Sequence, residues 1–248
     1  PFHKLFNQGM ILGDDGTKMS KSRGNVINPE DIIDQYGADA MRLYEMFMGP
    51  LNKSKPWNTK GLQGCYRFIN KLWSIIVAEE GGLSSKVIEN YTPDKETLHL
   101  HHSTIKKVEM DIENLHFNTA VSQLMIYCNH LQKCDSISKE LLLDLVKICS
   151  PFIPHIAEEF WFLLGHDKSI SKAPWPSFDN ALTQKDEITL AIQVNGKLRA
   201  SVEIRKDSDE ESAVKIALSL EKVENYTSKG TIFKTIYVPN RLLNFVVK

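Results

Sequence analysis

The spacing of hydrophobic residues along the chain changes once, near residue 187. Across residues 61–164, apolar side chains recur every three or four positions with few glycines between them, as in amphipathic helices. From Ile188 to Val194, apolar side chains alternate with polar or small ones, as in a half-buried strand. The chain is therefore predicted to form a helical bundle followed by a smaller module that contains strands.

The first long helix of the bundle is predicted to carry one core-facing stripe and one basic face. The stripe consists of Tyr66, Ile69, Trp73, Ile76 and Val77. Arg67 and Lys71 lie together on the opposite side, four residues apart. Such a pair is usually a solvated face, but in a bundle that binds RNA it could hold phosphates, and both interpretations stay open.

The C-terminal module is predicted to contain a hairpin, a helix and two further strands. Asn195-Gly196 is a strong signal for a two-residue hairpin turn. The sequence from Ser208 is typical of a helix start, and we expect that helix to run to about Leu220. Strands are expected at residues 231–238 and 242–247. A module of roughly 60 residues is close to the lower size limit for a stable core.

A short apolar run and two short helices are predicted before the bundle. Asn28 and Pro29 form a helix-start signal, and Gly37 is expected to end that helix and begin the next. In the second helix, Asp39 and Arg42 are expected to pair with each other across one turn.

Composition limits the class of protein without identifying it. The 248 residues are 42% hydrophobic and 25% charged, enough for one large domain or two to three smaller ones. A net charge of −1 offers no general attraction to nucleic acid, so any RNA contact must come from local basic patches. No apolar run reaches the roughly 20 residues of a membrane span, and the start is unlike a signal peptide, so a cytoplasmic location without membrane contact is expected. Because the sequence opens at Pro1 close to its most distinctive loop, we expect a piece or subunit of a longer protein.

Cysteine and histidine spacing predicts no metal site. The four cysteines form no Cys-x-x-Cys pair and are expected to be reduced thiols. His99, His101 and His102 lack acidic or cysteine partners at ligand spacing, which favours an exposed helical cluster over a metal site. His155 beside Glu158 and Glu159 is interpreted as a helix N-terminus rather than as metal or acid–base chemistry.

The most chemical stretch is the basic loop from Gly16 to Asn25, Gly-Thr-Lys-Met-Ser-Lys-Ser-Arg-Gly-Asn. Its small residues let backbone N–H groups approach an anion, and its lysines can follow charge as it moves between oxygens. Composition alone would favour an ordinary basic surface loop. A nucleotide-kinase loop is disfavoured, because Met19 stands where that motif needs a hydroxyl after its lysine.

The order of residues in this loop resembles the KMSKS signature of class I aminoacyl-tRNA synthetases. Residues 18–22 match it letter for letter, and residues 23–26 continue as in the leucine, isoleucine and valine enzymes. The resemblance implies a loop that closes over ATP and its Mg²⁺ while an amino acid attacks the α-phosphate. It assigns catalytic roles to Lys21 and Lys18, contact with the adenine to Met19, and loop shape to Ser20 and Ser22.

Three further segments resemble the same enzymes. One, Ser150 to Trp161, is similar to a helical-domain segment of the leucine, isoleucine and valine enzymes. The other two are the hairpin Val194 to Arg199 and the segment Tyr237 to Leu242, and both are similar to bacterial-type leucyl-tRNA synthetases. The resemblance implies a mainly α fold: the end of a catalytic domain (1–57), an anticodon-binding-like helical bundle (58–182) and a small α/β tRNA-contacting domain (183–248).

The resemblance also implies the partners. These are tRNA(Leu), together with ATP and, through an upstream part, leucine. The candidate tRNA contacts are Arg67, Lys71, Lys197 and Arg199, and a solvated strand face is the alternative for the last two. No H-I-G-H-like motif is found here, so the chain alone is expected to be inactive, to bind ATP weakly, and to be a monomer unless it is a natural split subunit. Two alternatives stay open: a piece of a valyl- or isoleucyl-tRNA synthetase, and a non-catalytic tRNA-binding module.

Overall fold

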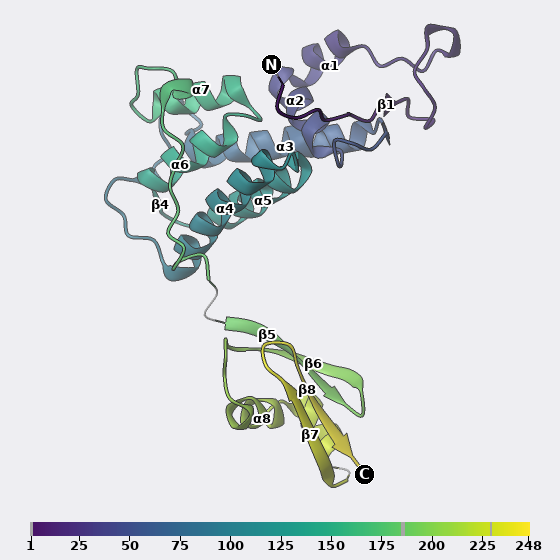
Figure 1. Ribbon diagram of the computed structural model, residues 1–248. Coiled ribbons are helices and arrows are strands. Elements are labelled where there is room, and N and C mark those ends of the chain that lie inside the picture. Colours follow the sequence, from purple (N-terminus) through teal and green to yellow (C-terminus); the bar gives the residue numbers. More distant parts are fainter. Residues whose placement is uncertain (1, 185–186, 229) are drawn as a thin grey trace. The chain divides into compact units, whose positions relative to one another are not determined.

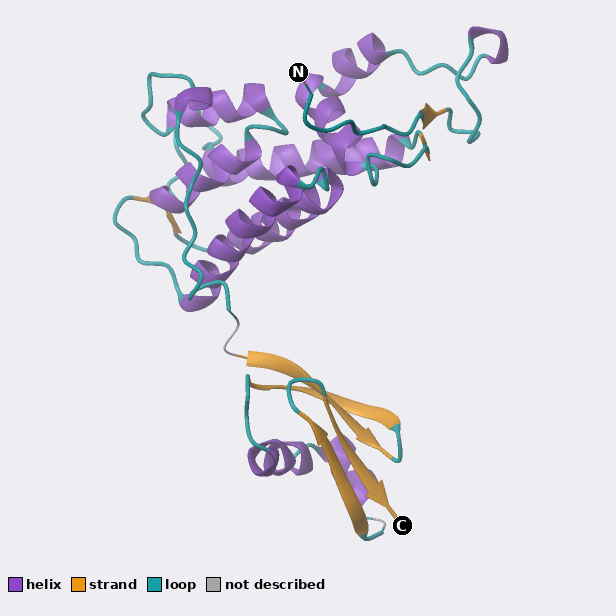
Figure 2. Ribbon diagram, viewed as in Figure 1, coloured by secondary structure: helices purple, strands orange, loops and turns teal. Residues whose placement is uncertain are grey.

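The computed structural model describes residues 2–184, 187–228 and 230–248. The chain divides into two compact units, Pro1–Thr183 and Gln184–Lys248 (Figure 1). As expected, the fold is mainly helical with one small mixed sheet (Figure 2). No helix of the described residues is long and apolar enough to cross a membrane.

The first unit is a helical bundle with a small N-terminal strand pair. Its helices are α1 (Pro29–Tyr36), α2 (Ala38–Phe47), α3 (Thr59–Ile76), α4 (Lys95–Glu113), α5 (Phe117–Leu131), α6 (Lys139–Cys149) and α7 (Pro154–Leu163). The short strands β1 (Ile11–Leu12) and β2 (Lys55–Pro56) pair in parallel, as do β3 (Val87–Ile88) and β4 (Ile137–Ser138). Two single turns of 3-10 helix, η1 (Lys21–Arg23) and η2 (Ile170–Lys172), complete the unit.

One hydrophobic core extends from Ile32 to Ile170 and crosses the predicted boundary at residue 57. Tyr44 on α2 and Trp57 before α3 pack edge to face there, with ring centroids 5.0 Å apart. The Tyr44 hydroxyl also accepts a 2.9 Å hydrogen bond from the Asn58 backbone. The domain boundary at residue 57 therefore stays a prediction drawn from the family resemblance. In the structure, the residues on its two sides pack into one compact unit.

The predicted stripe of α3 is wrong at two positions. Ile69, Ile76 and Val77 are buried, but Tyr66 is 37% exposed and Trp73 is 39% exposed. The buried face of the helix is made by Leu62, Cys65, Phe68, Ile69, Leu72, Ile75 and Ile76. The two aromatic rings lie at the margins of that face, where Tyr66 meets Tyr36 and Trp73 meets Phe160 at centroid distances of 5.6 and 5.4 Å.

The predicted Asp39–Arg42 pair is also absent, because both side chains bind the turn between α6 and α7. Asp39 is only 5% exposed, and its carboxylate accepts hydrogen bonds from the Ile156 backbone at 2.8 Å and from His155 Nδ1 at 2.9 Å. Arg42 donates twice to the Pro151 carbonyl, at 3.2 and 3.0 Å. Pro151 and Pro154 separate the two helices as expected, and Asp39 supplies the acceptor that the N-terminus of α7 needs.

The histidine cluster on α4 is structural and only partly exposed. His101 is 2% exposed and lies between Tyr127 and Asp144, with its Nδ1 3.0 Å from the tyrosine hydroxyl and its Nε2 3.4 Å from the carboxylate. His99 and His102 hold the extended segment that follows the bundle, through the Leu182 carbonyl at 2.8 Å and the Asp179 backbone N–H at 3.3 Å. Within the described ranges, no group of three or more His, Cys, Asp or Glu residues is placed to hold a metal ion.

The second unit is a four-stranded sheet in the order β6-β5-β8-β7 with two helices. Its elements are β5 (Glu187–Val194), β6 (Lys197–Arg205), α8 (Glu210–Leu218), α9 (Glu221–Thr227), β7 (Ile232–Val238) and β8 (Leu242–Val247). The hairpin prediction is confirmed, since Asn195 and Gly196 have φ values of 50° and 73°. The helix predicted to reach Leu220 ends earlier, at Leu218, and a separate short helix, α9, follows it.

The core of this unit lies between the sheet and its helices. Leu190, Ile192 and Phe245 are fully buried against Ala213 and Val223. The alternation along β5 therefore places one side of that strand in the core, as its sequence predicts.

Candidate active-site loop and RNA-binding surfaces

The basic loop joins β1 to α1 and extends away from the bundle (Figure 1). It leaves β1 through a tight turn in which the Gly13 N–H donates to the Thr17 carbonyl at 2.8 Å and the Gly16 N–H to the Gly13 carbonyl at 2.9 Å. Gly16 and Gly24 have φ values of 74° and 68°, a region that side chains disfavour. The two glycines of the motif therefore allow the chain to turn on either side of the lysines.

Asn25 organises this loop from within. Its side-chain oxygen accepts the Ser20 N–H at 2.9 Å. Its amide nitrogen donates to the Asp15 carboxylate, at 3.2 Å to either oxygen, and to the Thr17 hydroxyl at 3.1 Å. One side chain thus joins the two ends of the loop.

Asp15 is the second fixed point of the loop. The pKa of its carboxyl lies below the ordinary value, chiefly because the Thr17 backbone N–H and the Thr17 hydroxyl donate to it. The two bonds measure 2.9 and 2.8 Å. The charged carboxylate is therefore the form that holds this turn.

The five motif residues differ in how firmly they are held. Lys18 and Lys21 are exposed, and in the described part of the chain neither ammonium pairs with a carboxylate. Ser20 and Ser22 lie with their hydroxyls 3.0 Å apart, whereas Met19 packs partly against the bundle core. The loop therefore has a fixed frame and, among the described residues, two cations without ion-pair partners, an arrangement that suits an anion with several phosphate oxygens.

The two predicted cations of the bundle lie on the outer side of α3. Arg67 is exposed, whereas Lys71 is half-buried and donates to the Asn129 side chain on α5 at 2.6 Å. Lys71 therefore already contributes a bond between two helices, and Arg67 is the freer cation.

The two predicted cations of the hairpin also differ. Lys197 is exposed at the start of β6. Arg199 is half-buried, with its guanidinium carbon 3.8 Å from the centre of the Tyr226 ring on α9. Spacing along the strand predicts that both residues share a side, but it does not predict the aromatic partner.

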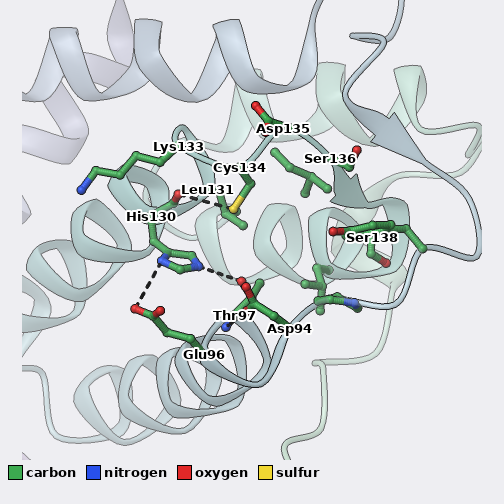
Figure 3. Close-up of a pocket in the computed structure, with 14 residues that line it drawn as sticks. Asp94, Glu96, Thr97, His130, Leu131, Lys133, Cys134, Asp135, Ser136 and Ser138 are labelled. Atoms are coloured by element: carbon green, nitrogen blue, oxygen red, sulfur yellow. Dashed lines mark hydrogen bonds and ion pairs between the residues drawn. The ribbon is translucent and has the colours of Figure 1, made fainter.

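A cavity of about 470 Å³ lies elsewhere, between the start of α4 and the α5–α6 connection (Figure 3). Several of its polar groups are already engaged: Asp94 caps α4 through the Thr97 N–H at 2.7 Å, and the Thr97 hydroxyl lies 2.7 Å from His130 Nε2. Burial raises the pKa of the Cys134 thiol at its edge, which makes it a poor nucleophile. These contacts are structural, and the loop remains the better candidate for chemistry.

Two models of known protein families match parts of this chain. A family model described as tRNA synthetases class I (I, L, M and V) matches residues 1–56, and one described as the anticodon-binding domain of tRNA ligase matches residues 94–215. The chain belongs to the class I aminoacyl-tRNA synthetases. Within this family, the loop of residues 18–22 falls in the part matched by the synthetase model.

A solved structure resembles this class I synthetase chain over its whole length. It is described as the ternary complex of Agrobacterium radiobacter K84 agnB2 LeuRS-tRNA-LeuAMS, and it is 30% identical with a TM-score of 0.70. The match covers 100% of this chain and 34% of that one, so the chain spans about a third of that protein's length.

Sequence reasoning missed some residues that shape these sites. The motif contains Asn25 without predicting its bonds, and the sequence does not predict that Tyr226 contacts Arg199. A polar residue at the end of a glycine-bounded loop is a usable signal for the first. Nothing local signals the second, because Tyr226 lies on a short helix remote from the hairpin in sequence.

Proposed function

We propose that this chain is the part of a leucyl-tRNA synthetase that closes over ATP and docks tRNA(Leu). The observation that carries the proposal is the loop itself, with Lys18 and Lys21 unpaired among the described residues on a frame fixed by Asn25. The two family models and the 30% identity to a LeuRS chain support it.

The proposed chemistry is amino-acid activation. The leucine carboxylate oxygen attacks the α-phosphorus of ATP, the bond from that phosphorus to the bridging oxygen breaks, and pyrophosphate leaves with the electron pair. Negative charge grows on the leaving phosphates, and the Lys21 and Lys18 ammonium groups stabilise it without giving up their protons. Mg²⁺ would accompany the ATP, and the leucine pocket would lie on a different part of the longer protein.

The proposed role of the helical bundle and the second unit is to bind tRNA. Arg67 and Lys197 are exposed cations suited to phosphate oxygens. Lys71 already donates to Asn129, so we assign it a secondary phosphate role. Arg199 is a further candidate for tRNA contact, beside the Tyr226 ring.

Two measurements test this proposal, one on the chain alone and one that compares it with the longer protein. Fluorescence anisotropy with labelled tRNA transcripts should show binding of tRNA(Leu), displaced by unlabelled tRNA(Leu) far better than by tRNA(Val) or tRNA(Ile). ATP–pyrophosphate exchange should show no leucine-dependent signal from the chain and a clear one from the longer protein.

The possible outcomes separate the alternatives. Equal displacement by tRNA(Val) or tRNA(Ile) would contradict the leucine assignment. Binding of tRNA together with an inactive longer protein would favour a non-catalytic RNA-binding module. Leucine-dependent ATP–pyrophosphate exchange by the chain alone would refute the proposal that the leucine pocket lies on another part of the longer protein.

A further inference from the structure

The hairpin of the second unit contains a β-bulge at Arg199. Along the β5–β6 pairing, Gln193 faces Leu198 and Ile192 faces Ala200, so Arg199 is an extra residue with no partner of its own. A bulge of this kind turns a side chain out of the regular alternation. Here it brings the Arg199 guanidinium to 3.8 Å from the ring centre of Tyr226 on α9.

Arg199 keeps unused hydrogen-bonding capacity at this position. Its Nε is buried and has no acceptor, and no carboxylate pairs with it within the described part of the chain. A guanidinium that served only the fold would be expected to find acceptors, because an unsatisfied buried donor is unfavourable. The guanidinium is thus held against the Tyr226 ring, but its Nε has no hydrogen-bond acceptor.

A hollow of about 370 Å³ opens beside this pair. It is lined by Leu198, Arg199, Lys222, Asn225 and Tyr226. Tyr226 is 41% exposed and Leu198 is 62% exposed, so an aromatic ring and an aliphatic side chain are both accessible. The acidic residues of α9, Glu221 and Glu224, do not line it.

This combination fits a nucleobase better than a phosphate group. A phosphate needs only positive charge and N–H donors, and it would leave the Tyr226 ring and Leu198 unused. An unstacked base instead uses a planar ring, a guanidinium plane and an amide that can both donate and accept at its edge. Asn225 supplies that amide, and Lys222 is one helical turn from Tyr226, where the phosphate of the same nucleotide could be met.

We propose that the hollow between the β5–β6 hairpin and α9 binds one unpaired nucleobase of a bound RNA. Tyr226 and Arg199 stack with the base, Asn225 contacts its edge and Lys222 contacts the adjoining phosphate. This inference rests on the proposed function, which makes tRNA the partner.

Variants of the chain test the stacking with labelled tRNA(Leu). Tyr226→Ala should weaken binding roughly 5- to 100-fold, the range for loss of one stacked base, and leave the salt dependence unchanged. Tyr226→Phe should stay within about twofold, since the ring is kept. Arg199→Lys keeps the charge but loses the plane and should also weaken binding, whereas Arg241→Lys, at an exposed position outside the hollow, should not. The opposite result would be wild-type affinity for Arg199→Lys, together with a change of about one unit in the salt dependence of binding for Arg199→Ala. It would indicate a phosphate contact and overturn the proposal.

A pair of titrations with the unaltered chain avoids any effect of substitution on folding. A single-stranded RNA hexamer and an abasic hexamer of equal charge are titrated while the ring signals of Tyr226 are followed by NMR. Only the base-containing hexamer should move them, and equal shifts from both, or none from either, would contradict base binding. Failure of the chain to bind tRNA(Leu) at all would refute the proposed function, while tRNA binding that is indifferent to Tyr226→Ala and Arg199→Lys would refute this inference alone.

Discussion

Two polar side chains in the first unit each accept a hydrogen bond from a backbone N–H, one within a loop and one between distant parts of the chain, and their surroundings differ. Asn25 accepts the Ser20 N–H inside the basic loop, where both residues are partly exposed. Asp39 holds the Ile156 N–H at the start of α7, and only 5% of this aspartate is exposed. Water can replace the first bond when it opens, whereas breaking the second leaves a buried carboxylate with fewer hydrogen-bond donors. The comparison indicates a loop that can open and a junction that cannot.

The largest expected effect is on rate, at the loop. In the longer protein, Lys21→Ala should lower leucine-dependent ATP–pyrophosphate exchange roughly 100- to 1,000-fold, the range for removing one preorganised charge-stabilising donor. Thermal unfolding should be unchanged, since Lys21 is exposed and has no ion-pair partner in the described residues. Lys60→Ala, at an exposed position in the first turn of α3, is the matched control. Equal activity of the two variants would remove Lys21 from the proposed mechanism.

The next effect is on stability, at the junction. Asp39→Ala should lower the free energy of unfolding of the first unit by roughly 2–3 kcal/mol, because it removes charged acceptors from the N-terminus of α7. Urea unfolding followed by tryptophan fluorescence reports this unit, since Trp57, Trp73, Trp161 and Trp175 all lie in it. Asp34→Ala, an exposed carboxylate on α1, should change stability by less than about 0.5 kcal/mol. If Asp39→Ala lowered the free energy of unfolding no more than Asp34→Ala does, the Asp39 bonds would not stabilise the junction.

A smaller and local effect is expected from Asn25→Ala. Loss of the Asn25 bonds should raise the rate of trypsin cleavage after Lys18, Lys21 or Arg23 by about fivefold, equivalent to roughly 1 kcal/mol of local opening. Global unfolding should change by less than about 0.5 kcal/mol. Asn70→Ala, at an exposed position on α3, is the comparison variant. Slower or unchanged cleavage would show that Asn25 does not hold the loop closed.

The smallest effect is the response of the loop to acid. The hydrogen bonds from Thr17 lower the pKa of the Asp15 carboxyl in the folded loop. At a pH above the ordinary carboxyl pKa the charged carboxylate stabilises the turn, and this stabilisation is lost as the pH falls through the lower pKa of the folded loop. The Thr17 amide signal should therefore shift below about pH 3.9 in an NMR titration. The Lys60 amide, which is capped by the neutral Asn58 side chain at 3.0 Å, is the internal reference. A Thr17 shift complete at higher pH would contradict the assigned bonds.

Some features of this protein follow from the sequence alone. The helical period of residues 61–164, the alternation along β5, the Asn195-Gly196 turn and the helix start at Asn28 are local signals, and the structure confirms each. The role proposed for the loop of residues 18–22 also rests on a local signal, the order of five consecutive residues, and it stays a prediction. Such features are readable because the residues that determine them lie within a few positions of one another.

Only the tertiary structure decides which partner a polar side chain takes when that partner is far along the chain. Asp39 and Arg42 are three residues apart and suited to pair, yet their partners lie 117 and 109 residues away. Tyr66 and Trp73 fit a helical stripe, yet they lie at its margin, because the neighbouring helices determine which arc of α3 is covered. Arg199 meets Tyr226 only through a bulge and a separate short helix. Local periodicity fixes which elements form, and packing between elements then determines which side chains are left free to act.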